Sequence, residues 1–297
     1  MPRPDWVLYK GKAGLGTLRG GEGRPYNEGM GNTTLAVAMA AALAGTSLDA
    51  VLAALRNHDD PRGQVEAAAE LSRRAGGMEP ADQHQAEAAL EAAATDPFSD
   101  GQARGKALDA LGNAAAKMGD ETIRRNAIRA LTEHASANGP MDARADTKVY
   151  ALRGLTYAAA RLPEDREIKE KVLSAALDAM RDQARPVERT QGAILFDTAI
   201  RNGCLGTLFS NQTLASRYEA EVITPLEAGG LDRLYDDASR VDYRFYLMRT
   251  LALTARVFQP QGGGISQRSR SILSQMADRD PDPRLREMAR LYSRNYR

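Results

Sequence analysis

The chain has 297 residues, of which 43% are hydrophobic, only 5% are aromatic and 27% are charged, and its formal net charge is +1. Cys204 is the only cysteine, which excludes an internal disulfide and a cysteine-rich metal site. Abundant alanine with few aromatic residues favours helices that approach closely around a thin core, in one elongated repeat domain or two compact ones.

Residues 1–31 are rich in glycine and proline, so we expect a flexible leader there. Charged residues interrupt any secretory signal at the start, and the apolar run at 35–44 is too short to cross a bilayer. If translation began at Met30, this run could resemble a signal core, but no basic segment precedes it. We therefore expect a cytoplasmic protein with no membrane span.

Residues that typically begin and end helices predict a series of helices after the leader. Asp60, for example, opens a helix that Gly76 and Gly77 end, and Pro80 starts the next. The helices are expected over 33–44, 47–57, 60–74, 80–94, 100–111, 120–131 and 144–161, from 165, from 185, over 211–229 and 241–258, and in two further helices after a break at 259–264.

One helix pattern recurs along the chain. Asp100 and Arg104, with small or aliphatic residues at helical spacing behind them, return twenty positions later as Asp120 and Arg124. The acid sits where it can accept from the free N–H groups of a helix start. Helix starts spaced by about 20 to 24 residues indicate a two-helix repeat of roughly 40–47 residues.

The last copy, at residues 282–289, reads Asp-Pro-Arg-Leu-Arg-Glu-Met-Ala and resembles the second helix of HEAT repeats, including the short variety related to phycobilin lyases. The resemblance covers about residues 60–297 and implies an all-α fold, a right-handed α-solenoid of HEAT-like hairpins. In that family the acid and arginine positions commonly form a hydrogen-bond ladder between adjacent repeats. A structural role is thereby implied for Asp100, Arg104, Asp120, Arg124, Asp282 and Arg286.

The composition and the repeat pattern of the sequence change near residue 202. Ten of the fifteen Phe and Tyr residues follow residue 195, and the predicted helix 211–229 lacks the repeat pattern. We therefore divide the chain into a leader (1–31), HEAT-like repeats (32–202) and a more aromatic C-terminal part that ends in a HEAT-like helix (203–297). This last part is either a subdomain or the thicker end of the solenoid.

Candidate chemical motifs are weak. Residues 29–34 resemble the phosphate loop of ParA-type ATPases, but Asn32 stands where the lysine should be and no strand precedes the loop, so helix capping explains them better. His58 before two aspartates could belong to a metal or acid–base site, but a capping turn is the simpler interpretation. His84 and Glu87 share a helix face, and Cys204 fits a buried small residue. We assign no catalytic, cofactor-binding or metal-binding residue.

The final helix carries a row of arginines at steps of four, four and three, which aligns them on one face. They are Arg286, Arg290, Arg294 and Arg297. Such a row suits the polar outer face of a terminal solenoid helix. It could instead bind anions, either nucleic acid phosphate, an acidic partner or a membrane surface.

From these features we expect a non-catalytic scaffold or adaptor that holds a protein partner on a concave face. One alternative is a nucleic-acid-binding protein that uses the basic C-terminal helix. The other is an enzyme, of the lyase or DNA glycosylase type, because alkylpurine DNA glycosylases use the same architecture. The sequence leaves the partner, the oligomeric state and export from the cell open.

Overall fold

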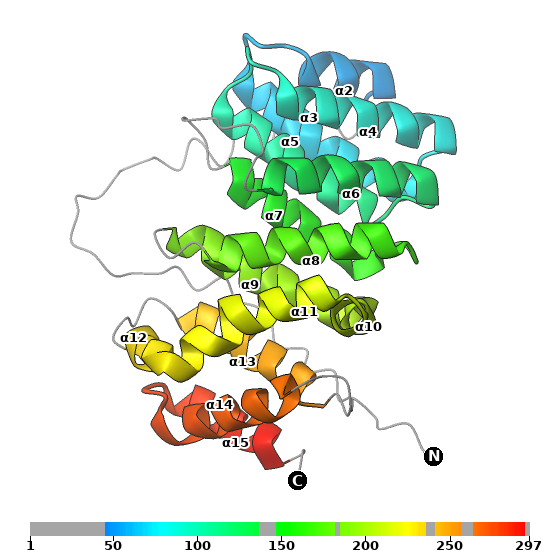
Figure 1. The fold of residues 1–297 in the computed structure, drawn as a ribbon. Helices are drawn as coiled ribbons and strands as arrows, with labels where there is room; N and C mark the ends of the chain where they lie inside the picture. Colours follow the sequence, from blue (N-terminus) through cyan, green and yellow to red (C-terminus); the bar gives the residue numbers. More distant parts are fainter. Residues whose placement is uncertain (1–44, 137–146, 182–184, 236–240, 257–263, 295–297) are drawn as a thin grey trace, which may run out of the picture.

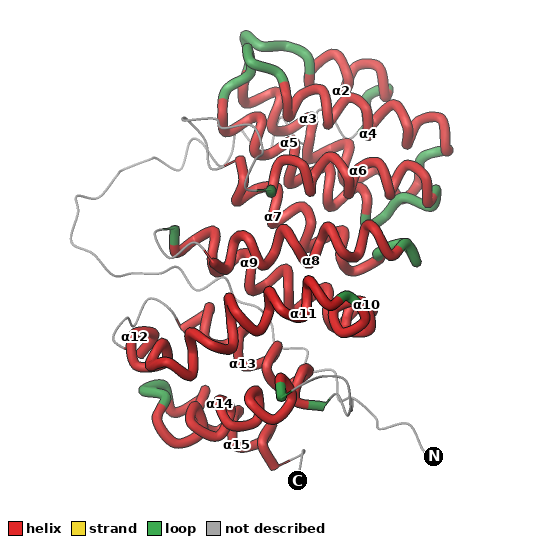
Figure 2. The backbone as a smooth tube through the Cα atoms, in the orientation of Figure 1, coloured by secondary structure: helices red, strands yellow, loops and turns green. Residues whose placement is uncertain are grey.

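A computed structural model describes residues 45–136, 147–181, 185–235, 241–256 and 264–294, and within these ranges the chain is helical with no strand. The helices stack into an elongated array, with the first at one end and the last at the other (Figure 1). Short loops join most of them (Figure 2). The leader, the predicted helix 33–44, residues 29–34, most of the break at 259–264 and Arg297 lie outside the described residues.

Successive helices alternate between two rows. The first row contains α3 (Pro61–Arg74), α5 (Gly101–Ala115), α7 (Thr147–Ala158), α9 (Pro186–Ala199), α13 (Val241–Ala255) and α15 (Pro283–Arg294). The second contains α2 (Leu48–Leu55), α4 (Pro80–Thr95), α6 (Glu121–Ala135), α8 (Arg166–Arg181), the segment α10 (Leu205–Ser210), α11 (Gln212–Tyr218), η4 (Glu219–Ile223), η5 (Leu226–Gly230) and α12 (Leu231–Tyr235), and α14 (Ile265–Arg279). Short turns η1 (Ala75–Gly77), η2 (Ala159–Arg161) and η3 (Ile200–Cys204) extend α3, α7 and α9.

From α3 to α9, neighbouring helices of the first row pack against each other more extensively than those of the second. For example, α5 packs along most of α7, whereas α4 touches α6 only in part. Glycines permit this approach. A Cβ atom at Gly112 would lie 2.1 Å from the carbonyl oxygen of Gly154, and one at Gly154 would lie 2.6 Å from that of Leu108. In a curved stack the more closely spaced row lies on the inside of the curve. We call the first row the inner row and the second the outer row.

The repeat length agrees with the prediction. Inner-row helices begin at residues 61, 101, 147, 186, 241 and 283, so four of the five steps lie between 39 and 46 residues. The longer step, from α9 to α13, contains the irregular segment from α10 to α12. The predicted helix 211–229 begins here as α11 and continues through π-helical turns to Gly229, whose φ of +88° breaks the helix.

The acid and arginine positions of the repeat act locally. Asp100, Asp120 and Asp282 each accept from backbone N–H groups in the first turn of their own helices, at 2.7–2.8 Å in the shortest bonds. Arg104 and Arg124 donate to carbonyl oxygens just before those helices, as Arg286 does in α15. The capping role is therefore confirmed, because these bonds close each helix start. The ladder between repeats that the resemblance implies for these residues stays a prediction.

One continuous cluster of buried apolar residues runs through both rows and across residue 202. Its N-terminal part is built largely from Ala and Leu, and larger groups fill the C-terminal part. There the rings of Phe196 and Tyr218 stack with centroids 5.3 Å apart. The guanidinium of Arg244 donates to Asp280 at 3.1 Å, and both side chains are fully buried. No helix in the described ranges is long and apolar enough to span a membrane.

We expect Gly112→Ala to destabilise the chain, because the new Cβ would meet the backbone of α7 and neither backbone can move away without opening the core. The clash should outweigh the roughly 1 kcal/mol that alanine gains over glycine inside a helix and leave a net loss of about 1–3 kcal/mol. Chemical denaturation followed by circular dichroism measures this loss.

The matched control is Gly206→Ala in α10, where a Cβ would meet nothing within 4 Å. This substitution should leave stability unchanged or raise it slightly. Equal stability of the two variants would contradict the close approach of α5 and α7.

Candidate functional site

The exposed side of the inner row forms a hollow where α3, α5 and α7 meet. It measures about 340 Å³ and includes Arg73, Lys106, Asp109, Asn113 and Tyr157 in its wall. These side chains come from three successive repeats, and the spacing of the inner row brings them together. The hollow is therefore a property of the stack and not of any single helix pair.

Tyr150 of α7 lies beside this hollow, against Gly105 of α5. Two cations approach its ring, with Lys106 Nζ at 5.4 Å and the Arg153 guanidinium carbon at 5.7 Å from the ring centroid. Arg153 also reaches Asp109 at 3.2 Å, and Lys106 reaches the same carboxylate at 3.9 Å. One carboxylate of α5 thus holds two cations, one from its own helix and one from α7.

The same arrangement recurs between α9 and α13. Asp197 of α9 is fully buried and lies 2.9 Å from Arg201, one turn later, and 3.3 Å from Arg249 of α13. Arg249 in turn lies over the rings of Phe245 and Tyr246, at 5.2 and 5.7 Å from their centroids. A buried carboxylate again holds two cations beside aromatic rings.

A third carboxylate joins α7 to α9 at their first turns. Glu188 is buried and lies 2.7 Å from Arg185, just before its own helix, and 3.4 Å from Lys148 of α7. Ion pairs therefore cross three successive junctions of the inner row, α5 to α7, α7 to α9 and α9 to α13. These ion pairs form a ladder between repeats, and its residues lie outside the repeated acid and arginine positions. We call Asp109, Glu188, Asp197 and their six cations the ion ladder.

Burial shifts the pKa of two carboxyl groups of the ladder, Asp109 and Asp197. It raises the pKa of Asp109 and that of Asp197, and the neighbouring cations oppose this shift only in part. The cations stand further out, since Arg201 has 43% of its side chain exposed and Asp197 has none. The ladder therefore presents its positive ends to solvent and keeps its negative ends underneath.

The predicted arginine strip lies at the end of the inner row. Arg290 and Arg294 are exposed on α15, and Arg286 is half-buried because it donates to the carbonyl oxygens of Asp280 and Pro281. A shallow groove of about 600 Å³ runs past all three arginines and the exposed Leu291. Helix α15 is thus the last member of the row that carries the ion ladder.

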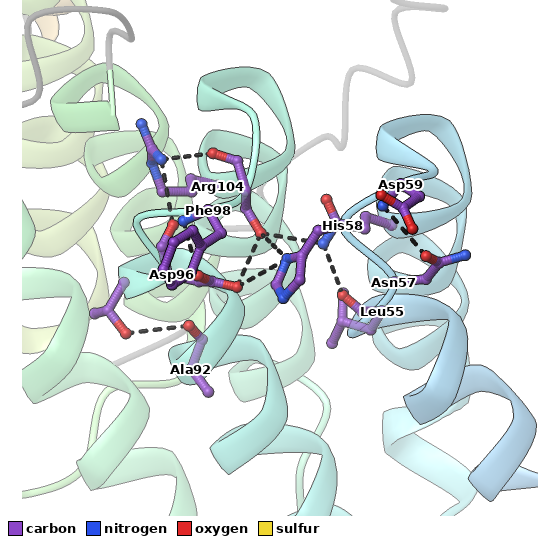
Figure 3. A network of polar contacts seen from close by, with 11 residues as sticks. Leu55, Asn57, His58, Asp59, Ala92, Asp96, Phe98 and Arg104 are labelled. Atoms are coloured by element: carbon purple, nitrogen blue, oxygen red, sulfur yellow. Dashed lines mark hydrogen bonds and ion pairs between the residues drawn. The ribbon is translucent and has the colours of Figure 1, made fainter.

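His58 takes part in a polar network that joins the turn before α3 to the turn before α5 (Figure 3). Its Nδ1 lies 3.1 Å from Asp96 and 3.5 Å from the Ser99 hydroxyl, which also lies 3.2 Å from Asp96. A catalytic triad needs the serine and the carboxylate on opposite nitrogens of the ring. Both groups contact the same nitrogen here, and Ser99 is buried and also accepts from Gln64, so this cluster ties two turns together.

The other candidate residues have structural surroundings. His84 pairs with the buried Glu87 at 3.6 Å, and Asp60 caps α3 through the N–H of Gly63 at 2.9 Å. Burial raises the pKa of Cys204 to about 12, which keeps it a thiol and confirms the interpretation as a buried small residue. Among the described residues, no group of three or more His, Cys, Asp or Glu side chains could hold a metal ion.

We expect the Asp197→Asn substitution to change how stability depends on pH. Because burial raises the pKa of Asp197 in the folded chain, the folded state binds its proton more tightly than the unfolded state does. The contribution of Asp197 to stability therefore rises as pH falls through the folded-state pKa towards the ordinary value of 3.8. The free energy of unfolding of the wild type, minus that of the variant, should increase on acidification from neutral pH.

Denaturant titrations at several pH values measure this difference. Asp49→Asn, at an exposed position of α2, is the control for the loss of one carboxyl group. A difference that shrinks on acidification would show that Arg201 and Arg249 outweigh burial.

Comparison with known proteins places this arrangement among helical repeat folds. No family model matches the sequence, and no curated protein matches it. Among solved structures, the fold is similar to the designed armadillo repeat protein YIII(Dq.V1)4CPAF in complex with peptide (KR)4. The TM-score is 0.55 at 17% sequence identity, over 85% of this chain and 100% of that chain. The fold is thus an all-α solenoid of helical repeats, and the narrower assignment to HEAT repeats stays a prediction.

Proposed function

We propose that this chain is a non-catalytic scaffold that binds an extended segment of a partner polypeptide along the concave face of the inner row. The distribution of exposed apolar side chains carries this proposal. The large ones on helices are Tyr157, Val187 and Leu291, with 42%, 58% and 59% exposed. All three belong to the inner row, on α7, α9 and α15, and Phe98 lies in the turn that enters α5.

Single exposed apolar residues are common on any protein surface, so their number alone has little meaning. Their confinement to one row is the informative feature, because within the described ranges no outer-row helix carries one. Such side chains cost solvation free energy unless a partner covers them. Their separation along the row favours a long partner over a compact one.

The geometry of the row also favours an extended segment. Packed helices lie about 8–10 Å apart, and an extended chain advances about 3.3 Å per residue, so each repeat matches about three residues of a partner. The six helices of the inner row, with five intervals between them, would accommodate about 14 residues. The designed armadillo repeat protein of similar fold is itself in complex with a peptide, which supports this use of the architecture.

Selection of a random peptide library of about 14 residues against the full chain tests the proposal. We expect enriched peptides whose affinity falls about tenfold when Tyr157→Ala and Val187→Ser are combined, because the apolar contacts of two neighbouring repeats are lost. Fluorescence anisotropy with labelled peptides measures the affinities.

The control is Arg129→Ala, at an exposed position of outer-row helix α6. Circular dichroism should show that all variants unfold at nearly the wild-type temperature. The proposal fails if no peptide is enriched, or if the selected peptides bind the Tyr157 and Val187 variant as tightly as the wild type.

A further inference from the structure

We infer that the segment bound along the inner row is acidic, a polypeptide stretch rich in Asp and Glu with apolar residues between them. This rests on the proposed function and adds the charge of the partner. Charge complementarity between the inner row and its partner is the basis, since a positive surface attracts and orients a negative one.

The two rows differ in charge. The helices of the inner row contain 14 Lys and Arg residues and seven Asp and Glu residues, an excess of seven positive charges. The outer row, from α2 to α14, contains 12 basic and 14 acidic residues, an excess of two negative charges. The net charge of +1 for the whole chain conceals this difference.

Burial of the inner-row carboxylates increases the difference in surface charge between the two rows. Of the seven inner-row carboxylates, Glu70, Asp109, Glu188 and Asp197 are the four that ion pairs hold beneath neighbouring cations. The remaining three, on α3, α13 and α15, are Glu66, Asp242 and Glu287. Most of the negative charge of this row is therefore out of reach of a partner. One of the 14 cations, Arg244, is also buried, against Asp280, and adds no positive charge at the surface.

The cations are already positioned before a partner arrives. Each carboxylate of the ladder pairs with one cation that is close to it in the sequence and with one from a neighbouring helix, so less side-chain entropy remains to be lost on binding. The positioned groups can each meet one carboxylate of a partner. Arg153 and Arg249 also lie against aromatic rings, which holds them along the surface.

An acidic polypeptide fits this surface better than a nucleic acid does. Among the described residues, two of the four large exposed apolar side chains, Val187 and Leu291, are aliphatic. Only Tyr157 and Phe98 offer a ring on which a base could stack, whereas a strand of nucleic acid stacks successive bases on successive rings. The ring of Tyr150 is already engaged by Lys106 and Arg153. The inner row carries both cations and exposed apolar side chains, which match a segment that contains both acidic and apolar residues.

The charge of this row sets the chain apart from its structural neighbour. That designed protein is in complex with (KR)4, a peptide of basic residues only. The excess of positive charge on the inner row predicts the opposite preference for this chain. A basic peptide would be repelled by the groups that the ladder presents.

Anisotropy measurements on the full chain with four labelled probes test the inference. The probes are an acidic peptide of Glu and Asp alternating with Leu and Tyr, the same peptide with Lys at every acidic position, (KR)4, and a single-stranded oligothymidine of matched length. We expect the acidic peptide to bind at least about tenfold more tightly than the other three, and its affinity to fall as salt rises.

A double variant, Lys106→Gln with Arg201→Gln, removes one half-buried and one exposed cation and leaves Asp109 and Asp197 paired with Arg153 and Arg249. It should weaken the acidic peptide about tenfold, whereas Arg129→Gln with Lys171→Gln in the outer row should weaken it less than about twofold. Both variants should keep the helical fold by circular dichroism, the first with some loss of stability because Asp109 and Asp197 each lose one of two cations.

The outcomes separate this inference from the proposed function. If the library selection yields neutral or basic peptides that still depend on Tyr157 and Val187, the scaffold function holds and the acidic preference is wrong. If the oligothymidine binds more tightly than the acidic peptide and depends on Lys106 and Arg201, the surface recognises nucleic acid and the inference is overturned. If no selected peptide depends on Tyr157 and Val187, both proposals fail.

Discussion

The close approach of α5 and α7 at Gly112 and Gly154 is the constraint on which the rest of the array depends. Backbone meets backbone at this crossing, so neither helix can carry a side chain there. The approach also brings Tyr150 onto Gly105 and places Arg153 within reach of Asp109. A wider spacing would break the contacts between these repeats and would flatten the inner row.

The ion ladder works within a narrow energetic balance. Removing a carboxylate from water costs more than a single surface ion pair returns, which is why burial raises the pKa of Asp109 and of Asp197 in spite of their cations. Two cations for each carboxylate reduce this cost without removing it. Because each carboxylate has two cations, every junction of the ladder carries one positive charge in excess. The ion pairs that join neighbouring repeats therefore also give the surface its positive charge.

The sequence predicted the helices because their signals are local. Asp100 and Asp120 each accept a hydrogen bond from a backbone N–H two residues later, at the start of the helix that they cap. Prolines mark other helix starts. The ladder could not be found in this way, since Asp109 and Arg153 are 44 residues apart and nothing in one helix specifies its partner. The one local signal is the spacing of Lys106 and Asp109, which are three residues apart and can pair within one helix.

The C-terminal arginines gain a different meaning once their row is known. Viewed along the sequence, Arg286, Arg290 and Arg294 look like a separate basic tail. In the fold, α15 is the sixth helix of the inner row, so these residues lie at the far end of the row whose first helices carry Arg73 and Lys106. Capping the end of the solenoid and binding an anionic partner are then compatible roles, because a polar terminal helix closes the core on one face and extends the binding surface on another.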